Sequence, residues 1–173
     1  MRLVQWVRFT WELDALSVLS PELPEHYHFT VAGPPNEKEL RAVIARSFAH
    51  DTSWGGAIHE ISAMVETWLE SAFDPLAKTI VVALCHGTRI IGATILVPDP
   101  AAEDQFAPGP CVQMEYRNRG LGTALLAEGL RRLQEAGLSR ATTIARSNGP
   151  VARFLYPKFA GVVVPGTPPL LAA

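Results

Sequence analysis

The segment CVQMEYRNRGLGTALLAEGLRRLQEAG, residues 111–137, decides the fold of this chain. Its first letters predict a β-strand over 111–116, and leucines at helical spacing predict a helix over about 121–136. Between them stands Arg117-x-x-Gly120-x-Gly122, a turn that can present backbone N–H groups at the start of a helix. The glycines allow an anion to come close, and the arginine adds charge-assisted contacts. The segment therefore predicts a phosphate-binding turn, although a pair of glycines also fits an ordinary turn.

Two common phosphate-binding motifs do not fit this turn. A dinucleotide-binding turn needs a third small residue where Leu125 stands, and an acid about 20 residues past the glycines, where Arg140 stands. A P-loop needs the tripeptide Gly-Lys-Ser/Thr, which does not occur in the chain.

A second motif follows the predicted strand 140–145. It reads N-x-x-x-A-x-x-x-Y-x-K, with Asn148, Ala152, Tyr156 and Lys158 at its fixed positions. Together with the glycine turn it resembles the coenzyme-binding half of the GNAT superfamily of N-acetyltransferases, over about residues 110–161. The resemblance implies an acetyl-CoA-dependent N-acetyltransferase that transfers an acetyl group directly to a primary amine.

The resemblance also implies a role for each matching residue. The main chain of Cys111 and Val112 would pair with the pantetheine arm of acetyl-CoA, and Asn148 would contact the same arm. An N–H group near Val112 would polarise the thioester carbonyl. Tyr156 would protonate the departing thiolate, since a phenol with a pKa of about 10 is still protonated at neutral pH. The pyrophosphate would contact Arg117, Asn118, Arg119, Gly120, Leu121, Gly122 and Thr123.

The sequence departs from the family pattern around Tyr156. The spacing from Asn148 to Tyr156 is one residue longer than is usual in the family, and Pro157 follows directly. Because proline disfavours the helical conformation in the preceding residue, we expect Tyr156 at a helix end with an altered direction. A packed aromatic residue with no catalytic role is the alternative interpretation.

The rest of the chain predicts an α+β (mixed α/β) domain with a mixed central sheet flanked by helices. Strands are expected at 3–11, 26–32, 79–85, 90–97 and 161–164, and helices at 37–48 and 57–72, the first capped by Asn36. We divide the chain into an N-terminal extension, 1–25, and an N-acetyltransferase domain, 26–173. Only one short strand follows Gly161, so the strand at 3–11 is expected to take the missing edge position of the sheet, in this chain or in the partner of a homodimer.

Charge is distributed unevenly along the 173 residues. Residues 1–116 hold 7 basic and 15 acidic side chains, whereas 117–173 hold 8 basic and 2 acidic ones. The basic part suits the phosphates of a coenzyme, and the acidic part would favour the approach of a cationic amine. The chain lacks the interleaved aromatic residues and recognition motifs of a nucleic-acid binder.

Composition predicts one soluble, cytoplasmic domain with no membrane segment and no metal. The two cysteines, Cys85 and Cys111, form no CxxC motif, and charged residues interrupt the apolar N-terminus. The apolar stretch 79–97 has His86 and Arg89 near its centre, which favours two strands over a membrane helix. The histidines show no metal-binding spacing with cysteines or acids.

The amine acceptor is not specified by any motif, and it could be a small molecule or a protein amine. Trp54 is the better candidate for the acceptor pocket, whereas core packing is expected for Trp68 and Phe73. The base that deprotonates the amine is not located either; the nearby acids Glu103, Asp104 and Glu115 are expected to be solvated. The alternative function is a non-catalytic acyl-CoA-binding or regulatory module of the same fold.

Overall fold

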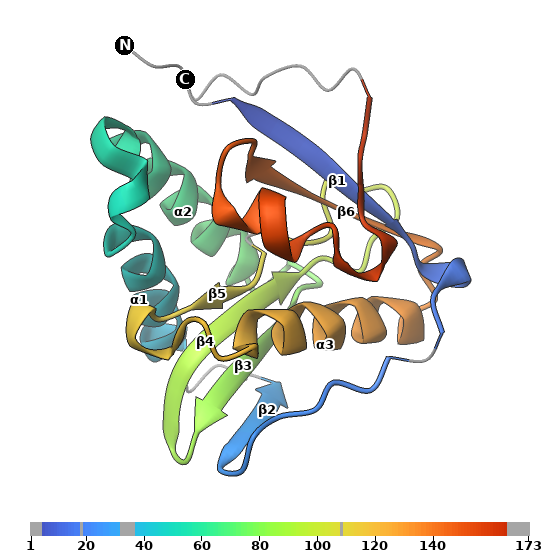
Figure 1. The fold of residues 1–173 in the computed structure, drawn as a ribbon, viewed down its shortest axis with the longest axis horizontal. Helices are drawn as coiled ribbons and strands as arrows, with labels where there is room; N and C mark the ends of the chain where they lie inside the picture. Colours follow the sequence, from blue (N-terminus) through green and yellow to red (C-terminus); the bar gives the residue numbers. More distant parts are fainter. Residues whose placement is uncertain (1–4, 18, 32–36, 108, 166–173) are drawn as a thin grey trace.

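The computed structural model describes residues 5–17, 19–31, 37–107 and 109–165, without the side chains of residues 52 and 53. Two antiparallel sheets, three α-helices and several short turns form one α+β architecture (Figure 1). The elements are, in chain order, β1 (Trp6–Glu12), η1 (Leu13–Ala15), β2 (Tyr27–Val31), α1 (Glu37–Ala49), η3 (Thr52–Ala57), α2 (Ile58–Ala72), β3 (Ile80–His86), β4 (Arg89–Leu96), β5 (Cys111–Val112), η4 (Met114–Tyr116), α3 (Leu121–Glu135), β6 (Arg140–Arg146), η5 (Val151–Leu155), η6 (Lys158–Ala160) and β7 (Val162–Val163).

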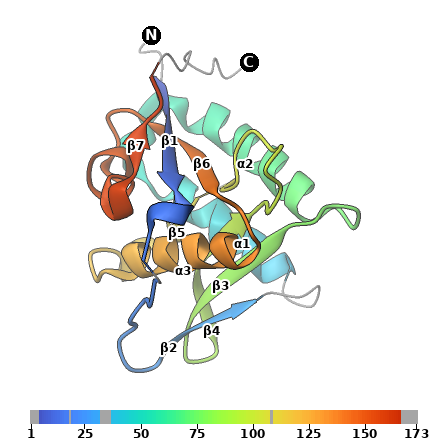
Figure 2. The same ribbon diagram turned by 90° about the vertical axis from the view of Figure 1, so that its right-hand side faces the viewer.

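The hairpin of β3 and β4 is the centre of the larger sheet, which has the order β2-β3-β4-β5. Its sequences, IVVALCH and RIIGATIL, are apolar on both faces, and helices cover both. Val81, Ala83 and Ile95 pack in a cluster with α1 and α2, whereas Val82 and Leu84 pack in a second cluster with α3. Figure 2 shows α3 on the face opposite to α1 and α2.

The smaller sheet has the order β6-β1-β7. β1 pairs with β6 from Trp6 opposite Arg146 to Glu12 opposite Arg140. On its other side β1 pairs with β7 through Phe9 and Thr10. The strand expected at the edge of the sheet is therefore the middle strand of this smaller sheet, so the expected edge position is wrong, and the strand pairs within this chain. The boundary between 1–25 and 26–173 and the homodimer stay predictions.

The two sheets part between β5 and β6. β5 bonds to β4 through only two residue pairs, Gly92 with Val112 and Ala93 with Cys111. After Val112 the chain leaves the sheet for the turn η4, so the strand predicted over 111–116 is wrong beyond its first two residues. The expected single mixed sheet is accordingly divided in two, because no ladder joins β5 to β6 among the described strands.

Most other predicted elements agree with the structure to within one to three residues. The predicted cap Asn36, and the first two residues of the strand expected at 3–11, lie outside the described residues. Among the described helices, none is long and apolar enough to cross a membrane.

Candidate coenzyme and acceptor site

A cavity of about 590 Å³ opens where the two sheets part. One wall comes from 109–112 around β5, and the opposite wall comes from Ile144, Ala145 and Arg146 on β6. The start of α3 and the turn η5 close one end, whereas α1, η3 and α2 close the other. The cavity thus connects the predicted phosphate turn with the helices that precede it in the sequence.

The turn before α3 has the backbone shape that an anion needs. Asn118 and Gly120 have positive φ values of 63° and 77°. The first helical bond runs from the N–H of Ala124 to the carbonyl of Gly120, and the N–H groups before it have no partner within the helix. Asn118 and residues 120–123 line the cavity. With Arg117, six of the seven predicted pyrophosphate residues therefore lie together at the cavity wall, and only Arg119 is absent.

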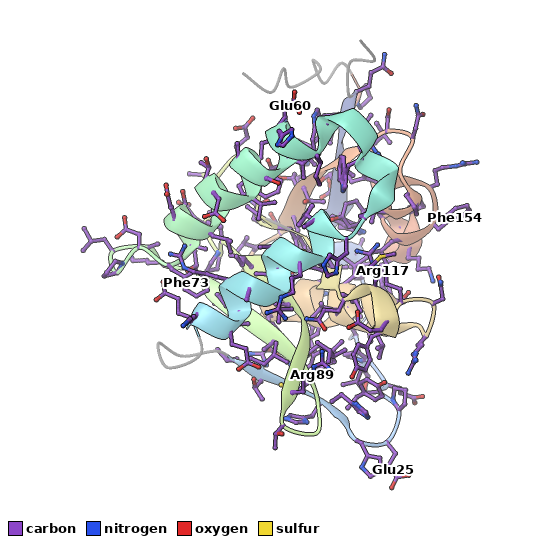
Figure 3. All side chains as sticks on the ribbon, turned by 90° about the vertical axis from the view of Figure 1, so that its left-hand side faces the viewer. Glu25, Glu60, Phe73, Arg89, Arg117 and Phe154 are labelled. Atoms are coloured by element: carbon purple, nitrogen blue, oxygen red, sulfur yellow. The ribbon has the colours of Figure 1, made fainter. Side chains whose placement is uncertain are left out.

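The two arginines of this turn are held by the protein. The Arg117 guanidinium donates from Nε to the carbonyl of Val112 at 2.9 Å, and from Nη2 to the carbonyl of Ser47 at 2.8 Å. It also pairs with Asp51 at 3.4 Å. Arg117 thereby connects β5, α1 and the loop before η3, and Figure 3 shows it between these elements and α3. A phosphate contact by its side chain stays a prediction beside this structural role.

Arg119 and Asn148 lie outside the cavity lining. Arg119 is exposed, donates to the carbonyl of Glu115 at 3.2 Å and lies 5.5 Å from the centre of the Tyr116 ring. Asn148 is exposed in the turn after β6, and the neighbouring 149–151 line the cavity instead. The contacts predicted for both residues remain untested.

Tyr156 is 3% exposed and lines the cavity. Its ring packs edge-on against Phe9 at 5.6 Å and Trp11 at 5.4 Å, both from β1. The hydroxyl lies so close to Gly109 that a Cβ there would overlap it. Burial raises the pKa of Tyr156, and a hydrogen bond with Thr143 only partly opposes this. The phenol is therefore a neutral proton donor throughout the physiological range.

The extra residue between Asn148 and Tyr156 is accommodated by a change of helix type. η5 is a π turn, in which the N–H of Tyr156 bonds to the carbonyl of Val151, five residues earlier. A π turn contains one residue more than an α turn. Tyr156 has φ −67° and ψ −24°, a helical conformation despite Pro157. Tyr156 therefore stands at the end of this turn, as expected, and the residue lines the cavity.

Cys111 lies opposite this tyrosine in the cavity wall and is a free thiol. Burial raises the pKa of Cys111 to about 11, against opposing effects of Ser47 and Arg117. A thiol with so high a pKa stays protonated at neutral pH and is a poor nucleophile.

Aromatic side chains form the end of the cavity near α1 and α2. Trp54 lies 5.9 Å from Trp6 and 6.3 Å from Phe48, between ring centres, and Phe48 lies 6.3 Å from Trp68. All four line the cavity. Trp54 thus lines the cavity, and its role in an acceptor pocket stays a prediction. Trp68 packs against the core beneath α2, as expected, but it also reaches the cavity, whereas Phe73 is absent from the lining.

None of the three acids considered as a base lines the cavity. Glu103 and Asp104 pair with Arg8, and Glu115 is exposed and lies 3.8 Å from Arg89. The described lining instead contains the carboxylate of Asp51. Sequence reasoning missed Asp51 because it stands in a loop without a motif, and only the packing of that loop against Arg117 brings it to the cavity.

The turn before α3, the parting of β5 from β6 and the buried Tyr156 lie around one cavity. The model of the Acetyltransferase (GNAT) family matches residues 43–161. This chain belongs to the GNAT acetyltransferase family. Within this GNAT domain, the match includes α2, the hairpin and both motifs.

Solved structures show the same fold for the GNAT domain. A functionally unknown conserved protein from Staphylococcus epidermidis aligns with a TM-score of 0.63 at 15% identity, covering 94% of this chain and 59% of that one. A Drosophila protein gives 0.61 at 12%, covering 94% and 48%. A GCN5-related N-acetyltransferase from Sphaerobacter thermophilus gives 0.59 at 18%, covering 94% and 50%. The chain therefore spans about half the length of these structures. The comparison with curated proteins found no match.

The GNAT family uses acetyl-CoA, and the described residues suit it. The turn at 118–123 offers backbone N–H groups, and nothing lies within 4 Å of the Cβ position of Gly120, so an anion has room there. Within the described part of the chain, no group of three or more His, Cys, Asp or Glu side chains could hold a metal ion.

Proposed function

We propose that this domain transfers the acetyl group of acetyl-CoA directly to a primary amine. The observation that supports this most is that one cavity is lined by the phosphate turn of α3, by Tyr156 and by the aromatic residues beside α1 and α2. A coenzyme that enters at α3 and an amine that enters from the aromatic end would meet between β5 and β6. Bound acetyl-CoA supplies the activated thioester.

The chain's own residues orient the reactants and move one proton. The main chain at Cys111 and Val112 is the edge of the larger sheet facing the cavity, where the pantetheine arm can lie along it. As the new C–N bond forms and the C–S bond breaks, Tyr156 gives its proton to the thiolate sulfur. The ammonium loses one proton to solvent before it attacks. The nitrogen loses a second proton as the amide forms, and that proton balances the one that returns to the Tyr156 phenolate.

A first experiment measures coenzyme binding. Acetyl-CoA should raise the melting temperature of the wild-type protein, because a ligand that binds only the folded state stabilises it. In Gly122→Asp the new carboxylate repels phosphate, although a negative charge at the start of α3 is favourable for the helix dipole. The new Cβ lies 3.9 Å from Cδ2 of Leu155, an ordinary van der Waals contact. This variant should melt like the wild type and lose the acetyl-CoA shift. Ser139→Asp, with the same charge in an exposed turn at the other end of α3, should keep it.

A second experiment measures transfer. Acetyl-CoA and a panel of primary amines are added to the protein, and release of free CoA thiol is followed together with the mass of the product. Amine-dependent release supports the enzyme. A coenzyme shift without release on any amine would favour the non-catalytic binding module, and the absence of a shift would contradict both functions.

A further inference from the structure

The acceptor end of the cavity has an unusual composition for a site that takes a polyamine or a lysine side chain. Four aromatic rings, from Trp6, Phe48, Trp54 and Trp68, line it in a connected series. Aromatic walls of this extent favour a flat or bulky apolar ligand body through burial and ring stacking. A slender aliphatic amine would leave much of this surface in contact with water.

A guanidinium is the charged group on this aromatic wall. Arg146 is the last residue of β6, stands opposite Trp6 in the sheet, and places its Cζ 4.3 Å from the centre of the Trp54 ring. It lines the cavity. A guanidinium over an aromatic ring keeps its N–H donors in its own plane, and its five donors can serve more than one partner. Such a group attracts a carboxylate, and it repels a second cation.

Most acidic side chains of residues 1–116 lie outside the cavity lining. Their described pairs lie outside the cavity lining: Glu12 with Arg140, Glu37 with Arg41, and both Glu103 and Asp104 with Arg8. The carboxylate that does line the cavity, Asp51, is paired with Arg117. The charge excess of residues 1–116 therefore does not make this site acidic. Next to Asp51, the described lining carries Arg117, Arg146 and Lys158.

We propose, on the basis of the function above, that the acceptor is a primary amine that carries both an aromatic ring and a carboxylate. An aromatic α-amino acid is the simplest example. The aromatic wall holds the ring, and Arg146 binds the carboxylate. The amino group then faces the parting of β5 and β6, where the thioester would lie. Arg146 is a specificity residue in this scheme, and it takes no part in the bond changes.

The test compares amines that differ only in the carboxylate. kcat/KM is measured for L-tryptophan against tryptamine and for L-phenylalanine against phenethylamine, with spermidine as the cationic alternative. We expect wild-type protein to favour each carboxylated amine by about ten-fold or more, since one charge-assisted contact contributes more than about 1.4 kcal/mol. In Arg146→Met the preference should disappear through a higher KM for the amino acids, with little change for tryptamine.

Two matched variants separate recognition from stability. Arg146→Lys keeps the charge without the planar fork and should retain only part of the preference. Arg140→Met removes an exposed arginine from the other end of β6 and should leave it unchanged. Titration of the coenzyme-bound protein with L-tryptophan, followed by calorimetry, gives a readout independent of turnover.

The outcomes distinguish this inference from the proposed function. Acetylation of spermidine or tryptamine in preference to both amino acids would overturn the acceptor assignment and leave the acetyltransferase intact. An unchanged carboxylate preference in Arg146→Met would likewise overturn it. If no amine in the panel causes the release of CoA thiol, the proposed function itself is contradicted.

Discussion

At the scale of single residues, the position of Tyr156 depends on contacts that are distant in sequence. Phe9 and Trp11 from β1 support its ring, and the indole N–H of Trp11 donates to the carbonyl of Lys158 at 3.0 Å, just after it. The π turn of η5 supplies the additional residue that the spacing requires. A motif with an inserted residue can therefore keep Tyr156 at the cavity wall.

We predict that Tyr156→Phe lowers kcat by about ten-fold or more and leaves the affinity for acetyl-CoA nearly unchanged, because only the proton for the thiolate is lost. Steady-state kinetics and coenzyme titration measure the two effects. A tyrosine ordinarily has a pKa of about 10. Because the pKa of Tyr156 is raised, its phenol stays protonated there, and the wild-type rate should not fall between pH 8 and about pH 10. Tyr116→Phe, which keeps its ring and lies outside the cavity lining, is the control. An unchanged kcat in Tyr156→Phe would remove this residue from the mechanism.

At the scale of elements, α3 packs closely on the larger sheet at Gly129. Gly129 lies in the middle of the helix, where an alanine is intrinsically preferred by about 1 kcal/mol. A Cβ at this position would lie 2.6 Å from Cε1 of Phe106 and 3.3 Å from Cδ2 of Leu96. Phe106 is 1% exposed and has no room to withdraw. Close packing of α3 on β4 explains this glycine better than helix propensity does.

We predict that Gly129→Ala lowers the free energy of unfolding, because overpacking costs about 1–3 kcal/mol and exceeds the gain in propensity. Urea denaturation measures the change as a lower midpoint. Gly56→Ala is the control, since nothing lies within 4 Å of its Cβ position. A variant at Gly129 that is more stable than the wild type would show that α3 can move away from the sheet.

At the scale of the whole molecule, the N-terminal strand joins the two motifs of the second half. β1 stands between β6 and β7, and its Phe9 and Trp11 are buried in the same cluster as Tyr156 and α3. Without β1, two strands would lose their ladder bonds, and the ring of Tyr156 would lose its support. The segment that begins the chain is therefore part of the site's structure.

We predict that a chain starting at residue 26 will not unfold cooperatively and will not bind acetyl-CoA. Circular dichroism during heating and the coenzyme-induced shift are the measurements. A chain that starts at Gln5 should behave like the full sequence, since it keeps β1. A cooperative transition in the shorter chain would support an independent domain over 26–173.

The sequence by itself determined the local features of this protein. Apolar periodicity and turn residues located its helices and the β3–β4 hairpin, and the two motifs indicated the family and the phosphate turn. These signals are readable because they depend on neighbours a few residues apart.

Tertiary structure alone decided the composition of the site. The parting of β5 from β6, the place of β1 between β6 and β7, and the contacts of Arg117 with Ser47 and Asp51 all join residues far apart in the chain. The stacking of Arg146 on Trp54 is of the same kind. No periodicity records such contacts, because they arise only when helices and sheets pack and each side chain takes the partner that packing provides.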